Sequence, residues 1–208
     1  MIEVEYIDTW GFKHAVRGMR NAMNSWDKSD SEFKFNFDNE LEFMVGKNDL
    51  DLMRRLFKAG TEHRTYARMI QVSMDITAPL YWWKEMDRYT IGKSQVSCST
   101  MHKIAEKEFT LDDFSTDRLL DFSWNRLADL IQHLNICRKK FLETKDKDDW
   151  WQMIQLLPSS YNQRRTICMS YETVFKIIKE RTGHKLDEWN KFVDILKTLP
   201  YIKEITEE

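Results

Sequence analysis

Apolar residues recur along this chain with two different periods, and each period predicts a different kind of element. Between residues 66 and 76 apolar and polar side chains alternate, which is typical of a strand that is buried on one face. Residues 3–7 alternate more weakly, and residues 41–45 form a short apolar run. The pattern therefore predicts three strands, all of them in the first 80 residues.

Most other apolar residues repeat every three to four positions, which is the spacing of an amphipathic helix. Asn48 is a suitable N-cap, and Thr77 can cap a later helix that has Pro79 in its first turn. Gly60 and Gly183 suit helix ends. The expected helices cover residues 10–23, 48–60, 77 towards 92, 116–141 (with a start at Ser115 or Thr116), 150–157 before Pro158, 167–181 and 186–199.

Strands come first in this order and helices follow, which indicates an α+β fold. We expect a small mixed or antiparallel sheet with long helices and a mainly helical second half. No linker rich in Gly, Ser or Pro and no repeat divides the chain, so residues 1–208 are expected to form a single domain. Short disordered stretches are expected at residues 27–32 and 145–149 and from residue 203 onward.

Composition excludes several classes of protein. Hydrophobic residues make up 42% and charged residues 32%, which is a globular balance. The net charge of −2 leaves no basic excess for a nucleic-acid polymer. The sequence shows no signal-peptide core and no apolar run long enough to cross a bilayer, so no membrane association is expected. Cys98, Cys137 and Cys168 form no CxxC pair, so we expect reduced thiols in a cytoplasmic protein.

Candidate chemistry is concentrated in one polar run and one early helix. The five histidines are dispersed, and therefore no metal site is expected. Around Gly92 a polar run offers cations, hydroxyls and free backbone N–H groups for a phosphate, although a solvated turn explains the same residues. The run contains Arg88, Lys93, Ser94, Gln95 and Ser97.

Two further pairs of residues have a structural and a functional interpretation. Arg17 and Arg20 share one face of the first helix, where they either bind an anion or lie on the surface. Trp82 and Trp83 suit a core or a subunit interface better than a surface on which a ligand ring stacks.

The stretch from residue 62 to residue 97 resembles the central signature of the flavin-dependent thymidylate synthases. In that family a Glu-His pair precedes a strand, an Ala-Pro-aromatic helix follows, and an Arg-rich loop comes next. Here Glu62-His63 matches the pair, Ala78-Pro79-Leu80-Tyr81 matches the helix start, and Arg88 falls on the first Arg of the loop. The last third also resembles the family, from Leu157-Pro158 through Arg165-Thr166 to Arg181.

The resemblance implies a homotetramer that binds FAD and a pyrimidine nucleotide between subunits. It implies that the protein methylates a deoxyuridine nucleotide, with a folate as carbon donor and NADPH as reductant. Carried over by position, the catalytic residues are Gln95 and Ser97, and the flavin residues are His63, Arg88, Tyr89, Ile91, Arg181 and Lys185. The nucleotide residues are Arg17, Arg20, Glu85, Lys93, Ser99 and Arg165.

The sequence also departs from the family. Tyr89 and Thr90 replace the His and the second Arg of the loop, and the Arg that follows the family's serine is absent. Ser97 or Cys98 takes the place of that serine, depending on the gap. A second hypothesis is therefore a nucleotide-binding or sequestering protein without catalysis, of a kind that a phage or mobile element uses. A third is an interaction protein with no small-molecule site.

The long helix at residues 116–141 and the Trp82-Trp83 pair predict an oligomer, because large exposed apolar patches usually mark interfaces. We expect light scattering at micromolar concentration to give a mass of several chains. A mass near that of one chain would contradict this prediction.

Overall fold

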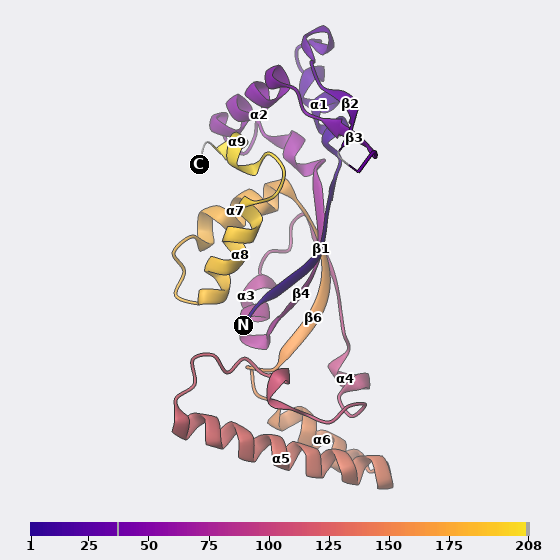
Figure 1. The fold of residues 1–208 in the computed structure, drawn as a ribbon, viewed down its shortest axis with the longest axis vertical. Coiled ribbons are helices and arrows are strands. Elements are labelled where there is room, and N and C mark those ends of the chain that lie inside the picture. The colour runs from indigo at the N-terminus through magenta and orange to yellow at the C-terminus, as the bar shows by residue number, and fades with distance from the viewer. Residues whose placement is uncertain (37, 207–208) are drawn as a thin grey trace. The chain divides into compact units, whose positions relative to one another are not determined.

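The computed structural model describes residues 1–36 and 38–206, and it confirms the α+β class (Figure 1). In this part of the chain one sheet has four strands in the order β1-β4-β6-β5, and a separate antiparallel pair joins β2 to β3. The strands are β1 (Glu3–Trp10), β2 (Glu32–Phe35), β3 (Leu41–Met44), β4 (Gln71–Pro79), β5 (Lys93–Ser97) and β6 (Asn162–Ser170).

The α-helices are α1 (Phe12–Asn21), α2 (Lys47–Ala59), α3 (Leu80–Met86), α4 (Thr100–Lys103), α5 (Asp121–Thr144), α6 (Lys147–Leu156), α7 (Tyr171–Arg181), α8 (Asp187–Lys197) and α9 (Ile202–Thr206). Short 3-10 turns are η1 (Trp26–Lys28), η2 (Thr65–Arg68) and η3 (Leu111–Asp113).

The chain divides into two compact units, and each strand of the four-stranded sheet is shared between them. Unit 1 comprises Met1–Glu5, Asp75–Arg88 and Gln95–Thr166. Unit 2 comprises Tyr6–Met74, Tyr89–Ser94 and Ile167–Glu208. The expectation of a single domain over residues 1–208 stays a prediction.

The strand expected from residue 66 begins only at Gln71, because Thr65–Arg68 form η2. From there on, strand β4 confirms the alternating pattern in the sequence. Its buried positions include Val72, Met74 and Ile76, and the residues between them are half-buried. The strand extends beyond the expected end, however. Thr77 belongs to β4 and caps no helix, and α3 begins only after Pro79, which is its N-cap. Pro79 suits this junction because its fixed φ of −68° is compatible with extended backbone, which is the conformation of both a strand residue and a helix N-cap.

Helix α3 buries the tryptophan pair in unit 1. Trp82 and Trp83 are both fully buried, and their rings meet edge-on with centroids 4.9 Å apart. The pair therefore belongs to the core, and it supplies no exposed surface for the oligomer expected from the sequence. Helix α5 is more exposed than expected, because Leu120 just before it is 67% exposed and Trp124 is 40% exposed. Its buried residues Leu127 and Ile131 pack in the core that α5 shares with α6. Figure 1 shows the two helices side by side.

The helix expected at residues 167–181 is two elements. Ile167 and Met169 are buried at alternate positions of β6, and α7 begins only at Tyr171. Ser170 separates the two elements as an N-cap, since its side chain accepts the N–H of Thr173. The second half of the chain therefore contributes a central strand to the sheet, in addition to the expected helices.

Helix α1 begins two residues later than expected. Gly11, its N-cap, has φ of 98°, a conformation that favours glycine. A Cβ at Gly11 would lie 2.0 Å from the carbonyl oxygen of Met69, so the close approach of these two backbone segments also requires glycine. Helix α1 can therefore start only at Phe12.

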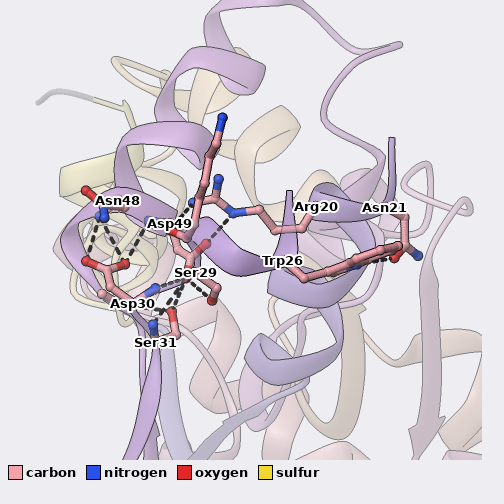
Figure 2. Close-up of polar contacts among 10 residues, drawn as sticks. Arg20, Asn21, Trp26, Ser29, Asp30, Ser31, Asn48 and Asp49 are labelled. Atoms are coloured by element: carbon pink, nitrogen blue, oxygen red, sulfur yellow. Dashed lines mark hydrogen bonds and ion pairs between the residues drawn. The ribbon is translucent and has the colours of Figure 1, made fainter. Parts of the chain in front are cut away.

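The segment expected to be disordered at residues 27–32 is ordered by the side chain of Asp49 in unit 2 (Figure 2). This carboxylate is fully buried and accepts hydrogen bonds from Arg20 Nε at 2.7 Å and from the hydroxyls of Ser29 and Ser31, each at 2.6 Å. Two more donors are the backbone N–H groups of Asp30 and Ser31. A charge buried in this way is stable only with such partners.

Asp30 makes the matching contact at the start of α2. Its carboxylate accepts the backbone N–H groups of Asn48 and Asp49, which are donors that a helix start leaves free. Asn48 is therefore inside the helix, and the N-cap is Gly46. The other two stretches expected to be disordered also contain helix, since α6 begins at Lys147 and α9 covers Ile202–Thr206.

Asp49 should be a principal determinant of stability. Burial acts to raise the pKa of Asp49, but hydrogen bonds from Ser29, Ser31 and Arg20 outweigh it and hold the pKa below its usual value. The Asp49→Asn variant leaves the Arg20 charge buried without a counterion, which costs about 3–5 kcal/mol. We expect urea unfolding at pH 7 to show this loss.

The pH dependence follows from the sign of the shift. A lowered pKa in the folded state stabilises fully above the pKa of an unfolded Asp, about 3.9, and this contribution is lost as pH falls through the folded pKa. The difference in the free energy of unfolding between wild type and Asp49→Asn should therefore become smaller as the pH falls below about 4. Asp51→Asn is the control, since the partner of Asp51 within the described part of the chain is the exposed Arg55, and this variant should cost about 0–0.5 kcal/mol. Equal losses for both variants would contradict this account.

Candidate functional site

Unit 1 contains a cavity of about 770 Å³ beside the residues that follow β5. We call it the Cys98 cavity. Its size is that of a typical small-molecule site. The lining residues come from β4, from the segment that follows β5 and from β6: Thr77, Cys98, Ser99, Thr100, Lys103, Ile104, Glu106, Lys107, Phe109, Asp112, Asp113, Tyr161, Asn162, Gln163 and Arg164.

A chain of hydrogen bonds fixes the cavity wall to the end of α3. The Asp87 carboxylate accepts from Gln95 Nε2 and from Arg165 Nη1, each at 2.8 Å. Arg165 Nε donates to Gln163 Oε1 at 2.9 Å, and Gln163 Nε2 donates to the carbonyl of Cys98 at 2.9 Å. The backbone at Cys98 is therefore held through three side chains, those of Gln163, Arg165 and Asp87.

The guanidinium of Arg165 also lies over the ring of Trp83, with Cζ 4.3 Å from the ring centroid. A stacked cation of this kind is held in place by the ring as well as by its hydrogen bonds. Two of the N–H groups of Arg165 are already donated, and its side chain is only 12% exposed. In this structure Arg165 does not line the Cys98 cavity; it supports Gln163, which does.

The cations of the cavity each have a carboxylate beside them. Lys107 contacts Asp113, Lys103 contacts Glu106, and Arg164 contacts Asp75 at 2.7 Å. Hydrogen bonds from Thr166 and from Arg164 hold the pKa of Asp75 below its usual value. The Lys103–Glu106 pair is exposed on both sides and therefore weak, so an incoming anion can compete for Lys103, whereas the partner of Lys107, Asp113, is buried.

Other polar groups of the cavity have no partner among the described residues. They are the hydroxyls of Tyr161, Thr77 and Thr100 and the amide NH2 of Asn162, whose Oδ1 accepts from Ser115 at 2.8 Å. Burial raises the pKa of Tyr161, with smaller contributions from Asp113 and Cys98. Tyr161 therefore stays a neutral hydroxyl, which can donate and accept.

The expected phosphate loop is only partly a loop. Residues 93–97 form β5, an edge strand that pairs with β6, so they do not offer a run of free N–H groups. Gly92, which has φ of 68°, turns the chain into this strand, and its carbonyl accepts the N–H of Ser170 at 2.8 Å. The loop interpretation of this stretch was therefore wrong from Lys93 onward.

The two residues with a predicted catalytic role point to different surroundings. Ser97 is exposed and does not line the Cys98 cavity, whereas Cys98, the alternative at that position, does. Gln95 donates to Asp87. Ser99 lines the cavity and also caps α4, because its hydroxyl accepts the N–H of His102 at 3.2 Å.

In unit 2 the predicted flavin residues Tyr89 and Arg181 form one cluster with Glu180, His184 and Trp189, which we call the Tyr89 cluster. Arg181 Nε donates to the Tyr89 hydroxyl at 2.8 Å, and that hydroxyl donates to Glu180 at 2.9 Å. The guanidinium of Arg181 lies over the Trp189 ring, 4.4 Å from its centroid, and reaches His184 at 3.0 Å. Burial raises the pKa of Tyr89, so this link keeps its proton at neutral pH.

The other predicted residues lie as follows. Arg88 in unit 1 is exposed, and its guanidinium has no partner among the described residues. Glu85 is half-buried in α3, and Lys93 is half-buried at the start of β5. In unit 2 His63, Ile91 and Lys185 are exposed, and Arg17 and Arg20 line a second, smaller cavity.

Sequence reasoning missed much of the cavity lining. Tyr161, Asn162 and Gln163 were not proposed, because residues 167–170 of β6 were taken for the start of a helix and the first half of the strand was assigned to no element. The alternation of Gln163 with the buried Ile167 and Met169 was the available signal.

In residues 1–36 and 38–206 no three His, Cys, Asp or Glu side chains gather as metal ligands. No described helix is long and apolar enough to cross a membrane.

Solved structures with the same fold match the whole chain. Flavin-dependent thymidylate synthase ThyX from Helicobacter pylori, complexed with FAD and dUMP, has a TM-score of 0.69 at 18% identity, over 99% of this chain and 98% of that one. The UMP/dUMP methylase PolB from Streptomyces cacaoi, bound with 5-Br dUMP, has a TM-score of 0.69 at 14% identity, over 100% and 93%. No protein-family profile and no curated protein sequence matches the chain. The resemblance read from the sequence is thus confirmed at the level of the fold.

The three thiols should differ in reactivity. Cys98 is exposed, whereas burial raises the pKa of both Cys137 and Cys168 and lowers their thiolate fraction. We expect a chromogenic disulfide reagent to label one thiol quickly in the native protein and all three after unfolding without a reductant. The Cys98→Ser variant should lose only the fast phase. Fewer than three thiols after unfolding, or a fast phase that persists in Cys98→Ser, would contradict the assignment.

Proposed function

We propose that this chain binds FAD and a pyrimidine nucleotide, and that it is a flavin-dependent methyltransferase acting on a deoxyuridine nucleotide. The observation that carries the proposal is the likeness in fold, over the whole chain, to a protein complexed with FAD and dUMP and to a UMP/dUMP methylase. Function does not follow from fold alone. The chemistry of the two groups of residues described above provides the second support.

The Cys98 cavity suits the nucleotide. Its volume of about 770 Å³ accommodates a nucleoside monophosphate. The amide NH2 of Asn162 and the hydroxyl of Tyr161 can bind the carbonyl oxygens and the N–H of a pyrimidine ring. Lys103 can exchange its exposed partner Glu106 for a phosphate, since charge-assisted bonds to phosphate are the stronger ones. The exposed ammonium of Lys107 has three donors, so it can contact a phosphate while it stays paired with the buried Asp113.

The residues assigned to the flavin fit this cofactor in their chemistry. Ile91 is 85% exposed, which is unusual for an apolar side chain and offers a surface for a planar ring. Lys185 and His63 are exposed donors in the same unit and are available for a pyrophosphate. Arg88, taken by itself in unit 1, is an exposed guanidinium without a partner among the described residues, which can bind a phosphate. Tyr89 and Arg181 already hold one another, and we assign them to positioning.

A bound flavin would supply the two electrons that convert a transferred one-carbon unit into a methyl group, with a folate as carbon donor and NADPH as reductant. The chain itself would bind and orient. In this scheme Asp87 and Gln163 keep the backbone at Cys98 fixed, and the cations hold phosphates. Holding reactants in a fixed geometry is itself a large part of catalysis.

We further propose that the chain acts as a homo-oligomer, a tetramer by analogy with the family, in the cytoplasm. Support comes from the edge strands. Tyr6 and Trp10 of β1 and Val96 of β5 are exposed apolar side chains on strands at the two edges of the sheet. Exposed apolar edge strands favour association.

The nucleotide and flavin assignments are tested by binding. We expect the purified protein to show the visible band of oxidised flavin after incubation with FAD, and to bind dUMP. Arg88→Ala should weaken the binding of FAD by about ten- to a hundred-fold, which is the value of one charge-assisted contact. Its melting temperature should not change, because no described residue depends on its guanidinium. Absorbance titration and calorimetry measure these quantities.

Lys84→Ala is the matched control, because Lys84 is an exposed cation one turn earlier on α3. It should leave both affinities unchanged. Turnover is then measured as conversion of dUMP to thymidylate with a methylene-folate and NADPH. Binding without turnover would favour the non-catalytic nucleotide-binding protein, and binding of neither ligand would overturn the proposal.

A further inference from the structure

Unit 2 contains a second cavity, of about 500 Å³, that the proposed function does not use. No member of the Tyr89 cluster lines it. Helix α1, the segment around η1 and strand β3 provide its walls, and we call it the Trp26 cavity. The lining residues are Lys13, Val16, Arg17, Arg20, Asn21, Trp26, Ser29, Ser31 and Phe43.

The floor of the Trp26 cavity is rigid and electrically balanced. Arg20 is only 5% exposed, and its Nε donates to the buried Asp49 carboxylate at 2.7 Å (Figure 2). The hydroxyls of Ser29 and Ser31 donate to the same carboxylate. Because these groups are hydrogen-bonded to one another, we assign them to shaping the cavity and assign the binding of a ligand to other residues.

The mouth of the cavity is positive. Lys13 and Arg17 are exposed and one turn apart on α1, and neither has an acidic partner among the described residues. The described lining contains three cations and no carboxylate. Like charges at i and i+4 repel one another by a few tenths of a kcal/mol. An anion placed between Lys13 and Arg17 would remove this repulsion and gain two charge-assisted bonds.

One wall of the cavity is aromatic and held in position. Trp26 is 52% exposed, yet its Nε1 donates to Asn21 Oδ1 at 2.8 Å, as Figure 2 shows. An exposed indole held in this way presents its face at a low cost in conformational entropy. Phe43 also lines the cavity, and Phe33 meets it edge-on at 5.3 Å between ring centroids. Aromatic faces of this kind stack on nucleobases.

We propose that the Trp26 cavity is a second nucleotide site, with the phosphate between Lys13 and Arg17 and the base against Trp26. The volume holds a mononucleotide and is too small for a dinucleotide the size of FAD. Two exposed cations without acidic partners among the described residues, of which Lys13 lies over the Phe33 ring at 5.3 Å from its centroid, and a net charge of −2 do not suit a nucleic-acid strand. The described lining contains one side-chain amide, Asn21, and its Oδ1 already accepts from Trp26, so only its NH2 group is left to contact a base. Since every nucleobase offers an acceptor to a single donor, the site selects a phosphorylated aromatic ring without discriminating between bases.

The test compares three probes, which are uridine 5′-monophosphate, adenosine 5′-monophosphate and inorganic phosphate. We expect both nucleotides to bind and to quench part of the tryptophan fluorescence. Trp26→Leu should abolish that quenching, and Arg17→Gln should lower the affinity for adenosine 5′-monophosphate by about ten- to a hundred-fold. Phosphate alone should bind at least ten-fold more weakly than either nucleotide, because it cannot stack.

Arg55→Gln is the matched control, since it removes an exposed arginine of α2 in the same unit, and it should change no affinity. Melting temperatures show whether each variant folds. No binding of either nucleotide to the wild type, an unchanged affinity in Arg17→Gln, or phosphate binding as tight as nucleotide binding would each overturn the proposal. This proposal and the proposed function can fail independently of each other. Arg88 does not line the Trp26 cavity, so Arg88→Ala should weaken the binding of FAD and leave the binding of adenosine 5′-monophosphate unchanged.

Discussion

The alternation of buried and half-buried side chains along β4 is the constraint on which most of the fold depends. Its buried residues, among them Val72 and Ile76, provide core, and the face between them carries Asp75 and Thr77. Both central strands then run directly into a helix, β4 at Pro79 and β6 at Ser170, without an intervening loop. A change in the register of such a strand would turn every side chain to the opposite face. The Trp83–Gln163 bond and the polar lining of the Cys98 cavity both depend on that register.

The sequence predicted elements that repeat a single period and failed where two periods meet. The strand at residues 71–76 and the helices α5, α7 and α8 were recognised because their patterns are regular, whereas the expected start of that strand at residue 66 was wrong. Strand β6 was lost because Ile167 and Met169 continue into the apolar stripe of α7, and the spacing of a short strand next to a helix can be read as a longer helix. Residues 27–32 were taken for disordered because the carboxylate that orders them, Asp49, lies about 20 positions along the chain.

The candidate sites show the same limit for charge. Sequence identifies which residues carry a cation but not which cations already have a partner. Arg165 and Arg20 were proposed as phosphate ligands, yet each contacts a distant carboxylate, Asp87 or Asp49. Arg88 and Arg17 were proposed on the same grounds, and their guanidinium groups have no partner among the described residues. Whether an arginine is paired with a carboxylate or can bind a ligand is therefore decided by the tertiary structure, and it cannot be read from the neighbouring residues in the sequence.

The buried group formed by Arg20 and Asp49 has a consequence for how this chain can vary among relatives. Loss of either charge alone leaves the other uncompensated in a dry environment, whereas simultaneous replacement of both by apolar residues of similar volume removes the penalty. Substitutions at these two positions are therefore strongly non-additive. A lineage can cross from the charged to the apolar arrangement only by way of an unstable intermediate, so residues 20 and 49 should be inherited as a pair, and Ser29 and Ser31 should be free to change only where the pair has changed first.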